Sequence, residues 1–220
     1  HRAEIAFRVV ARFAGIDSTA FVRGRFSADQ WQRLQSARQW AEQIGDRFLI
    51  DHGAAPSPMQ IKAKCKTLMR QVGLDAVFID YLQILSADQR TNGETERVTK
   101  ISNGLKQCQQ DLQLPVVVAS QLSRNSASEK REPELTDLRQ SGAIEQDCDV
   151  AAFLWAPDTG LSEEEQDEAQ DRNDPVLVDL LVKKHRGGRK GRVHMSFNGA
   201  RFEFTELRDG LVDEGRDGED

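Results

Sequence analysis

The chain is 220 residues long, 38% of them hydrophobic, and it carries a formal net charge of −6. This size favours one domain with a full core over two domains. The negative charge disfavours a protein that binds nucleic acid over its whole surface. No apolar run approaches the roughly eighteen residues of a membrane span, and the first residues lack the apolar core of a secretion signal. We therefore expect a soluble, cytoplasmic protein without a membrane partner.

Cysteine and histidine residues are few and scattered. The chain has three cysteines and four histidines, and no two cysteines have CxxC spacing. These spacings predict neither a disulfide framework nor a zinc site, and they fit a reducing compartment.

The first seventy or so residues are predicted to be mainly helical. Apolar residues recur at helical spacing over 5–13. A capping serine followed three residues later by glutamine marks the start of two more helices, over 27–44 and 57–73. A short apolar run at 47–51 predicts a strand.

The middle of the chain alternates between strand and helix patterns. Residues 76–80 and 115–120 are mostly apolar, as parallel strands buried on both faces are. A helical pattern runs through 98–112 between them. This alternation predicts an α/β fold with a mostly parallel sheet flanked by helices.

The last third of the chain is predicted to add strands and charged segments. Strand patterns cover 150–155 and 176–182, and a C-terminal β-hairpin is expected to turn at Asn198-Gly199. Residues 183–192 are strongly basic. Residues 208–220 are rich in Gly, Asp and Glu, so we expect a domain over 1–207 and an acidic, disordered tail over 208–220.

Asp80 ends the apolar run "VFID" at the carboxyl end of a predicted strand, which is where parallel α/β sheets bind ligands. Two interpretations stay open from the strand alone. One is an acid that caps the following loop. The other is the acid of a nucleotide triphosphatase, which holds Mg²⁺ directly or through water beside the phosphates.

Three further segments bear on the choice between these interpretations. Gln121 follows the next predicted parallel strand, and it is either a polar strand end or a contact for a γ-phosphate or its attacking water. The segment 137–149 carries Arg139 near Gly142, and glycine lets backbone amides approach a phosphate. The basic segment 183–192 is either a solvated turn or a source of positive charge for a phosphate.

Four segments, in this order, resemble the C-terminal ATPase domain of DnaB-family replicative DNA helicases. They are "VFIDYLQIL", "ISNGLKQCQQDLQLPVVVASQLSR", "DLRQSGAIEQDCDVAAFLW" and "KKHRGGRKGRVHMSFNGARFEF". The combination of "DLRxSGxIEQDxD" with "IDYLQ" and "SQLxR" is highly specific, and the similarity covers residues 5–204. It implies a RecA-like P-loop NTPase fold, of which this chain lacks the first strand and the P-loop.

The resemblance also implies roles for individual residues. Asp80 matches the Walker B acid that holds Mg²⁺, and Gln121 matches the residue that senses the γ-phosphate and couples it to DNA. Lys184 and Arg186 match the pair that reaches from one subunit into its neighbour's ATP site, with Arg186 as the arginine finger. The implied cofactors are ATP and Mg²⁺.

The remaining implied roles concern DNA and assembly. Arg139, Gln140 and Gly142 fall in the loop that faces the central pore of the family's ring and grips single-stranded DNA. Because the finger acts across an interface, the implied assembly is a homohexamer. Such loops follow phosphates without reading bases, so binding is expected to be salt-sensitive and independent of sequence. Primase and a helicase loader are further partners in the family.

The chain departs from the family pattern in several places. Gly187 and Arg189 stand where the family usually has asparagine and proline, and Gln140 replaces a glutamate, which removes one negative charge near DNA. The larger departure is that no G-x-x-x-x-G-K-[ST] motif occurs in the 220 residues. The amides and lysine of that loop bind the phosphates in this fold.

The sequence therefore predicts the C-terminal portion of a replicative helicase that couples ATP hydrolysis to translocation on single-stranded DNA and to duplex unwinding. We expect the intact protein to hydrolyse ATP and the 220-residue chain alone to be inactive. Two alternatives stay open. One is a truncated, non-catalytic module that binds DNA or joins rings, and the other is a RecA- or KaiC-like ATPase outside replication. The "DLRxSGxIEQDxD" loop weighs against the latter.

Overall fold

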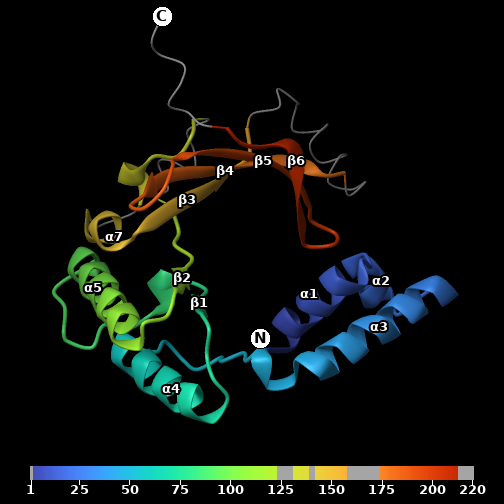
Figure 1. The fold of residues 1–220 in the computed structure, drawn as a ribbon, viewed down its shortest axis with the longest axis horizontal. Helices are drawn as coiled ribbons and strands as arrows, with labels where there is room; N and C mark the ends of the chain where they lie inside the picture. The colour runs from blue at the N-terminus through green and yellow to red at the C-terminus, as the bar shows by residue number, and fades with distance from the viewer. Residues whose placement is uncertain (1, 123–130, 139–141, 158–173, 213–220) are drawn as a thin grey trace, which may run out of the picture. The chain divides into compact units, whose positions relative to one another are not determined.

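A computed structural model describes residues 2–122, 131–138, 142–157 and 174–212 (Figure 1). The chain divides into two compact units. One comprises residues 1–52, 154–181 and 191–220, and the other comprises residues 53–153 and 182–190. The predicted site residues that the structure describes, namely Asp80, Gln121, Gly142, Lys184 and Arg186, belong to the second unit.

The first unit begins with three helices, α1 (Arg2–Ala14), α2 (Ser18–Arg23) and α3 (Ala28–Ile44). At the start of α3, the Ser27 hydroxyl accepts a hydrogen bond from the Gln30 N–H, and the Gln30 side chain accepts one from the Ser27 N–H. A small apolar cluster joins α1 to α3. Both helices predicted in this region are confirmed, whereas α2 has no counterpart among the predicted elements.

The prediction of a strand at 47–51 is wrong. A 3₁₀ turn, η1 (Gly45–Arg47), follows α3, and residues 48–51 have no regular secondary structure. A strand needs a neighbour to bind its backbone N–H and C=O groups. None of the described strands pairs with this run, and the side chains of Phe48 and Leu49 remain about half exposed.

The second unit is built from two long helices and a pair of strands. The helices are α4 (Pro58–Gln71) and α5 (Glu94–Leu112), and the strands are β1 (Val77–Ile79) and β2 (Val116–Val118), which pair in parallel. A 3₁₀ turn, η2 (Leu82–Ile84), follows β1. All four main elements were predicted from the sequence, and α5 contains the whole of the helical pattern predicted at 98–112.

Helix α5 contributes to both apolar clusters of the second unit. One cluster comprises Leu82, Leu85, Val98, Ile101, Leu105 and Ile144. The other comprises Cys65, Cys108 and Leu112. Ile79 and Val118 pack against the first cluster, while Phe78 and Val117 on the other face of the strand pair are 75% and 52% exposed. Within the described residues, therefore, the parallel pair buries one face.

Between β2 and the second sheet, the described residues form two short helical elements, η3 (Leu135–Asp137) and α7 (Gly142–Asp147). The second sheet has four strands in the order β3-β4-β5-β6. Their bounds are Val150–Trp155, Val176–His185, Gly191–Asn198 and Glu203–Val212. The α/β fold is confirmed, but the division of the strands into two sheets was not predicted.

The predicted hairpin is confirmed, since β5 and β6 pair antiparallel. The chain turns through residues 199–202, and β6 continues to Val212, into the range for which disorder was expected. Residues 213–220 lie outside the described residues, so that expectation stays a prediction for them. In the parts of the chain that the structure describes, no helix has both the length and the apolarity to cross a membrane.

Candidate functional site

Asp80 and Gln121 follow neighbouring parallel strands. Ile79 of β1 lies opposite Val118 of β2, and the Ala119 N–H donates a hydrogen bond of 2.9 Å to the Ile79 carbonyl. Both strands run in the same direction, so the segments that leave them start from the same edge of the sheet. The two residues thus lie at one sheet edge, as the sequence predicted.

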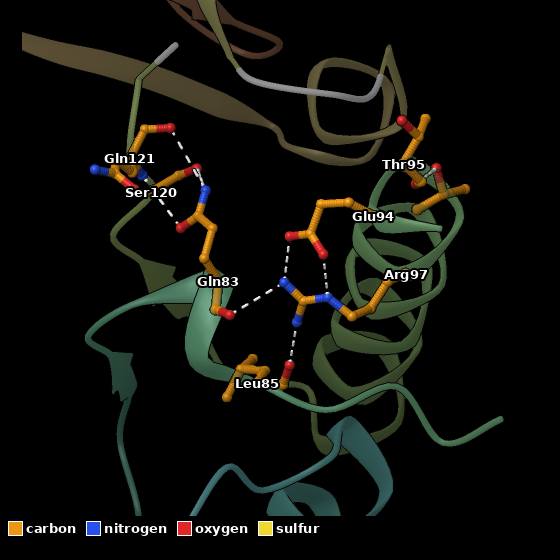
Figure 2. Close-up of polar contacts among 8 residues, drawn as sticks. Gln83, Leu85, Glu94, Thr95, Arg97, Ser120 and Gln121 are labelled. Atoms are coloured by element: carbon orange, nitrogen blue, oxygen red, sulfur yellow. Dashed lines mark hydrogen bonds and ion pairs between the residues drawn. The ribbon is translucent and has the colours of Figure 1, made fainter. Parts of the chain in front are cut away.

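Gln83 joins the two segments that leave the sheet, a role that the sequence analysis missed (Figure 2). Its side-chain amide donates to the Ser120 hydroxyl at 3.1 Å and to the Gln121 carbonyl at 3.5 Å. Its side-chain oxygen accepts from the Gln121 N–H at 3.2 Å. These bonds fix the backbone of Gln121. Gln83 belongs to the "IDYLQ" segment, which was the available sequence signal.

Arg97 in turn holds the backbone around Gln83 (Figure 2). Its guanidinium donates to the Gln83 carbonyl at 3.2 Å and to the Leu85 carbonyl at 2.6 Å. It also forms an ion pair with Glu94, which raises the pKa of Arg97. Helix α5 therefore supports the 3₁₀ turn η2, which carries Gln83.

The residues at this edge fit a divalent cation that also binds a nucleotide. The Asp80 side chain is exposed, so its oxygens are accessible to an ion. Proteins usually hold Mg²⁺ through one or two carboxylates, and waters and substrate phosphates complete the coordination. The described residues contain no group of three or more His, Cys, Asp or Glu side chains that could hold a metal by themselves. Asp80 therefore fits as a single protein ligand beside phosphate oxygens.

Asp137 fixes the start of the predicted DNA-binding loop. Its side chain is buried, and both of its oxygens accept hydrogen bonds from the Arg131 guanidinium, at 2.8 and 2.9 Å. The Glu134 N–H donates a third bond, at 2.8 Å. These bonds, with Arg131 foremost, lower the pKa of Asp137 below its ordinary value. The carboxylate therefore stays charged and anchors the loop at neutral pH.

The structure describes the chain on both sides of Arg139 and Gln140, but these two residues themselves lie outside the described residues. Before them, Leu138 forms an isolated antiparallel β-bridge with Leu122. After them, Gly142 is exposed and is the first residue of α7. The predicted loop therefore begins beside the segment that follows β2 and ends in a helix.

Lys184 and Arg186 both bind the C-terminal end of α7 and the residues just after it. The Lys184 ammonium donates to the Glu145 carbonyl. The Arg186 guanidinium donates to the Gln146 carbonyl at 2.9 Å and to the Asp149 carboxylate at 3.0 Å. Carbonyls at the end of a helix lack partners within the helix and attract cations. The structure thus places the side chains of Lys184 and Arg186 against the same short helix, α7.

Comparison with known proteins gives one consistent result. The family model described as the DnaB-like helicase C terminal domain matches residues 1–206. The replicative DNA helicase DnaB of Rickettsia prowazekii (strain Madrid E) is 31% identical over 214 residues, covering 93% of this chain and 44% of the relative. That of Mycobacterium leprae (strain TN) is 35% identical over 190 residues, covering 85% of this chain and 30% of the relative. The chain therefore spans less than half the length of these relatives.

Two solved structures share the fold. One is an ATPase domain, which superimposes with a TM-score of 0.78 at 28% identity, over 94% of this chain and 71% of that one. A DnaB-like replicative helicase, described with its interactions with primase, gives a TM-score of 0.79 at 28% identity, over 94% of this chain and 49% of that one. With the family model covering almost the whole chain, these likenesses show that the chain belongs to the family of DnaB-like helicase C-terminal domains.

Proposed function

We propose that this chain is the C-terminal part of a replicative DNA helicase that couples ATP hydrolysis to translocation on single-stranded DNA and to duplex unwinding. The observation that carries the proposal is the position of Asp80 and Gln121 at one sheet edge, with the segment after Gln121 bridged to the segment before Arg139. Nucleotide chemistry and DNA binding would then share one short stretch of backbone.

At the nucleotide, Asp80 would hold Mg²⁺, and Gln121 would contact the γ-phosphate. The bound ion would neutralise the charge that develops on the phosphates during hydrolysis. Gln83 would hold the backbone of Gln121 at the edge of the sheet, because it accepts a hydrogen bond from the Gln121 N–H. The 220 residues contain no P-loop, so this chain by itself would not hydrolyse ATP.

Lys184 and Arg186 would act on the ATP of a neighbouring subunit, which requires a ring and, in this family, a homohexamer. A guanidinium placed against the transferring phosphoryl group stabilises the transition state, and such a finger is worth about 10³ to 10⁵ in kcat. The Arg186 side chain is 56% exposed, so it is accessible to another subunit.

Arg139, Gln140 and Gly142 would bind the backbone of single-stranded DNA. Phosphate contacts of this kind carry no base preference, and they weaken as salt concentration rises. The related helicase structure described with primase supports a primase partner for the intact protein, and a loader would be needed to place a closed ring on DNA. The cytoplasm is the location that we propose for the intact protein.

The test is single-stranded DNA-stimulated ATP hydrolysis by the full-length protein, that is, this chain with whatever upstream residues its gene encodes. Asp80→Asn is expected to lower kcat at least about 100-fold, because the amide is a poor ligand for Mg²⁺. Asp75→Asn is the matched control, since Asp75 is an exposed acid at the opposite end of β1. It should keep kcat within about twofold. Normal turnover by Asp80→Asn would overturn the proposal.

A further inference from the structure

We propose that Asp149 is a positioning residue that holds the Arg186 guanidinium in place. Asp149 thereby connects helix α7, which follows the proposed DNA-binding loop, to the proposed arginine finger, Arg186. The inference rests on the proposed function, because it takes Arg186 to act on the ATP of a neighbouring subunit. Asp149 itself touches neither ATP nor DNA in this proposal.

Asp149 binds Arg186 through both its backbone and its side chain. The Arg186 N–H donates to the Asp149 carbonyl at 2.9 Å, and a guanidinium nitrogen donates to the Asp149 carboxylate at 3.0 Å. The second guanidinium nitrogen donates to the Gln146 carbonyl at 2.9 Å. Contacts at both ends of the arginine side chain restrict its rotamers, so the direction of the guanidinium is set before any neighbouring subunit arrives.

The carboxylate of Asp149 is also anchored from a second element. Its other oxygen accepts a hydrogen bond of 2.7 Å from the Lys106 ammonium, which comes from α5. This bond is the main reason why the pKa of Asp149 is lowered below its ordinary value, and the charge of Arg186 lowers it further. Asp149 therefore remains a carboxylate at neutral pH and connects α5 to the turn that carries the finger.

Helix α7 extends this connection towards the DNA-binding loop. It begins at Gly142, and it is held on α5 by a hydrogen bond of 2.6 Å from the Ser102 hydroxyl to Asp147 and by the buried side chain of Ile144. Its Glu145 carbonyl accepts from Lys184. Because α7 is only six residues long, a displacement of Gly142 would also move the carbonyls of Glu145 and Gln146, which accept hydrogen bonds from Lys184 and Arg186.

The exposure of the pair argues for positioning over stabilisation. The Arg186 and Asp149 side chains are 56% and 52% exposed, and ion pairs this accessible to water contribute little to folding. An acid that binds a cation without burying it instead fixes where the cation points while leaving it open to another molecule. A finger that acts across an interface needs both properties.

The experiment measures single-stranded DNA-stimulated ATP hydrolysis in rings of the full-length protein. Asp149→Asn is expected to lower kcat about 10- to 100-fold while changing KM for ATP less than about threefold, because a finger acts mainly in the transition state. Asp149→Glu keeps the charge and should restore kcat to within about fivefold of wild type. Asp111→Asn is the matched control: it breaks an ion pair with Lys62 between α5 and α4, and it should leave kcat unchanged.

A double variant separates positioning from other roles. Asp149→Asn added to Arg186→Ala should not slow turnover further, because the acid acts through the arginine. A clearly slower double variant would overturn the inference, as would wild-type kcat for Asp149→Asn. Loss of ring formation by Asp149→Asn would also count against it, since a half-exposed positioning pair is not needed for assembly. Each of these outcomes leaves the proposed function standing. Normal turnover by Arg186→Ala would instead remove both.

Discussion

Leu122 and Leu138 form an isolated antiparallel β-bridge, which joins the residue after Gln121 to the residue before Arg139. The proposed γ-phosphate sensor and the proposed DNA-binding loop are therefore connected through a single backbone pair. A small shift at either end has a short, hydrogen-bonded route to the other. The route gives the proposed coupling of hydrolysis to DNA movement a physical basis in named residues.

Gln83 is expected to affect this coupling more than ATP binding. Gln83→Leu removes the side-chain hydrogen bonds to Ser120 and to the Gln121 backbone while keeping a similar volume. In the full-length protein, the stimulation of ATPase by single-stranded DNA should fall about 3- to 10-fold, because each lost bond contributes on the order of 1 kcal/mol. The measurement is kcat with and without DNA. Gln107→Leu, an exposed glutamine on α5, is the control, and equal stimulation in both variants would contradict the prediction.

Arg139→Ala is expected to weaken binding of single-stranded DNA by a similar factor for every base sequence. The side chain is proposed to contact phosphate, so its removal should also reduce the slope of log affinity against log salt by about one. Fluorescence anisotropy with labelled oligonucleotides at several salt concentrations measures both effects. Arg70→Ala, on the exposed side of α4, should change neither. A variant that loses affinity for one base sequence only would show that the contact is to bases.

Gly104→Ala is expected to destabilise the second unit even though alanine favours helices. A Cβ at residue 104 would lie 2.9 Å from both the Cβ and the Cγ of Pro58, which is too close for real contacts. Replacing glycine inside a helix gains roughly 0.5–1 kcal/mol, whereas overpacking costs roughly 1–3 kcal/mol. Chemical denaturation should therefore show a lower free energy of unfolding. Asn103→Ala, at an exposed position of the same helix, should not lower it.

The buried thiols should react slowly in the folded chain. Burial raises the pKa of Cys108 to about 11, and it raises the pKa of Cys65 as well. At pH 8 both thiols should resist a disulfide reagent in the native state, whereas all three cysteines should react after unfolding. The folded state holds the proton of Cys108 more tightly than the unfolded state does. This difference adds to the free energy of unfolding below about pH 9, and the contribution is lost as the pH rises towards about 11. Rapid native modification of Cys108 would contradict the burial.

The elements that could be predicted from the sequence are those whose signals are local. Helices α3 and α4 begin where Ser27 and Ser57 form reciprocal hydrogen bonds with a glutamine three residues later, and that pattern is visible in the chain. The strand expected at 47–51 failed because an apolar run becomes a strand only when another strand binds it. Whether another strand pairs with residues 47–51 could not be inferred from the run itself, and none of the described strands does.

The same distinction applies to the site. Asp80 and Gln121 could be located because each ends a recognisable strand. The contacts of Gln83 and Asp149 could not be predicted, because their partners are 37 to 38 residues away in sequence, at Ser120, Gln121 and Arg186. No local pattern encodes such contacts. The roles of Lys184 and Arg186 came from the resemblance, and the structure adds that both are held by the end of α7.

Arg186→Ala in the full-length protein tests the central claim most directly. Nucleotide affinity, measured with a fluorescent ATP analogue, should stay within about threefold of wild type, because the finger acts on the transition state in the neighbouring subunit. Single-stranded DNA-stimulated hydrolysis should fall at least about 1,000-fold. Turnover at the wild-type rate would contradict the account, since Arg186 would then have no part in a shared ATP site.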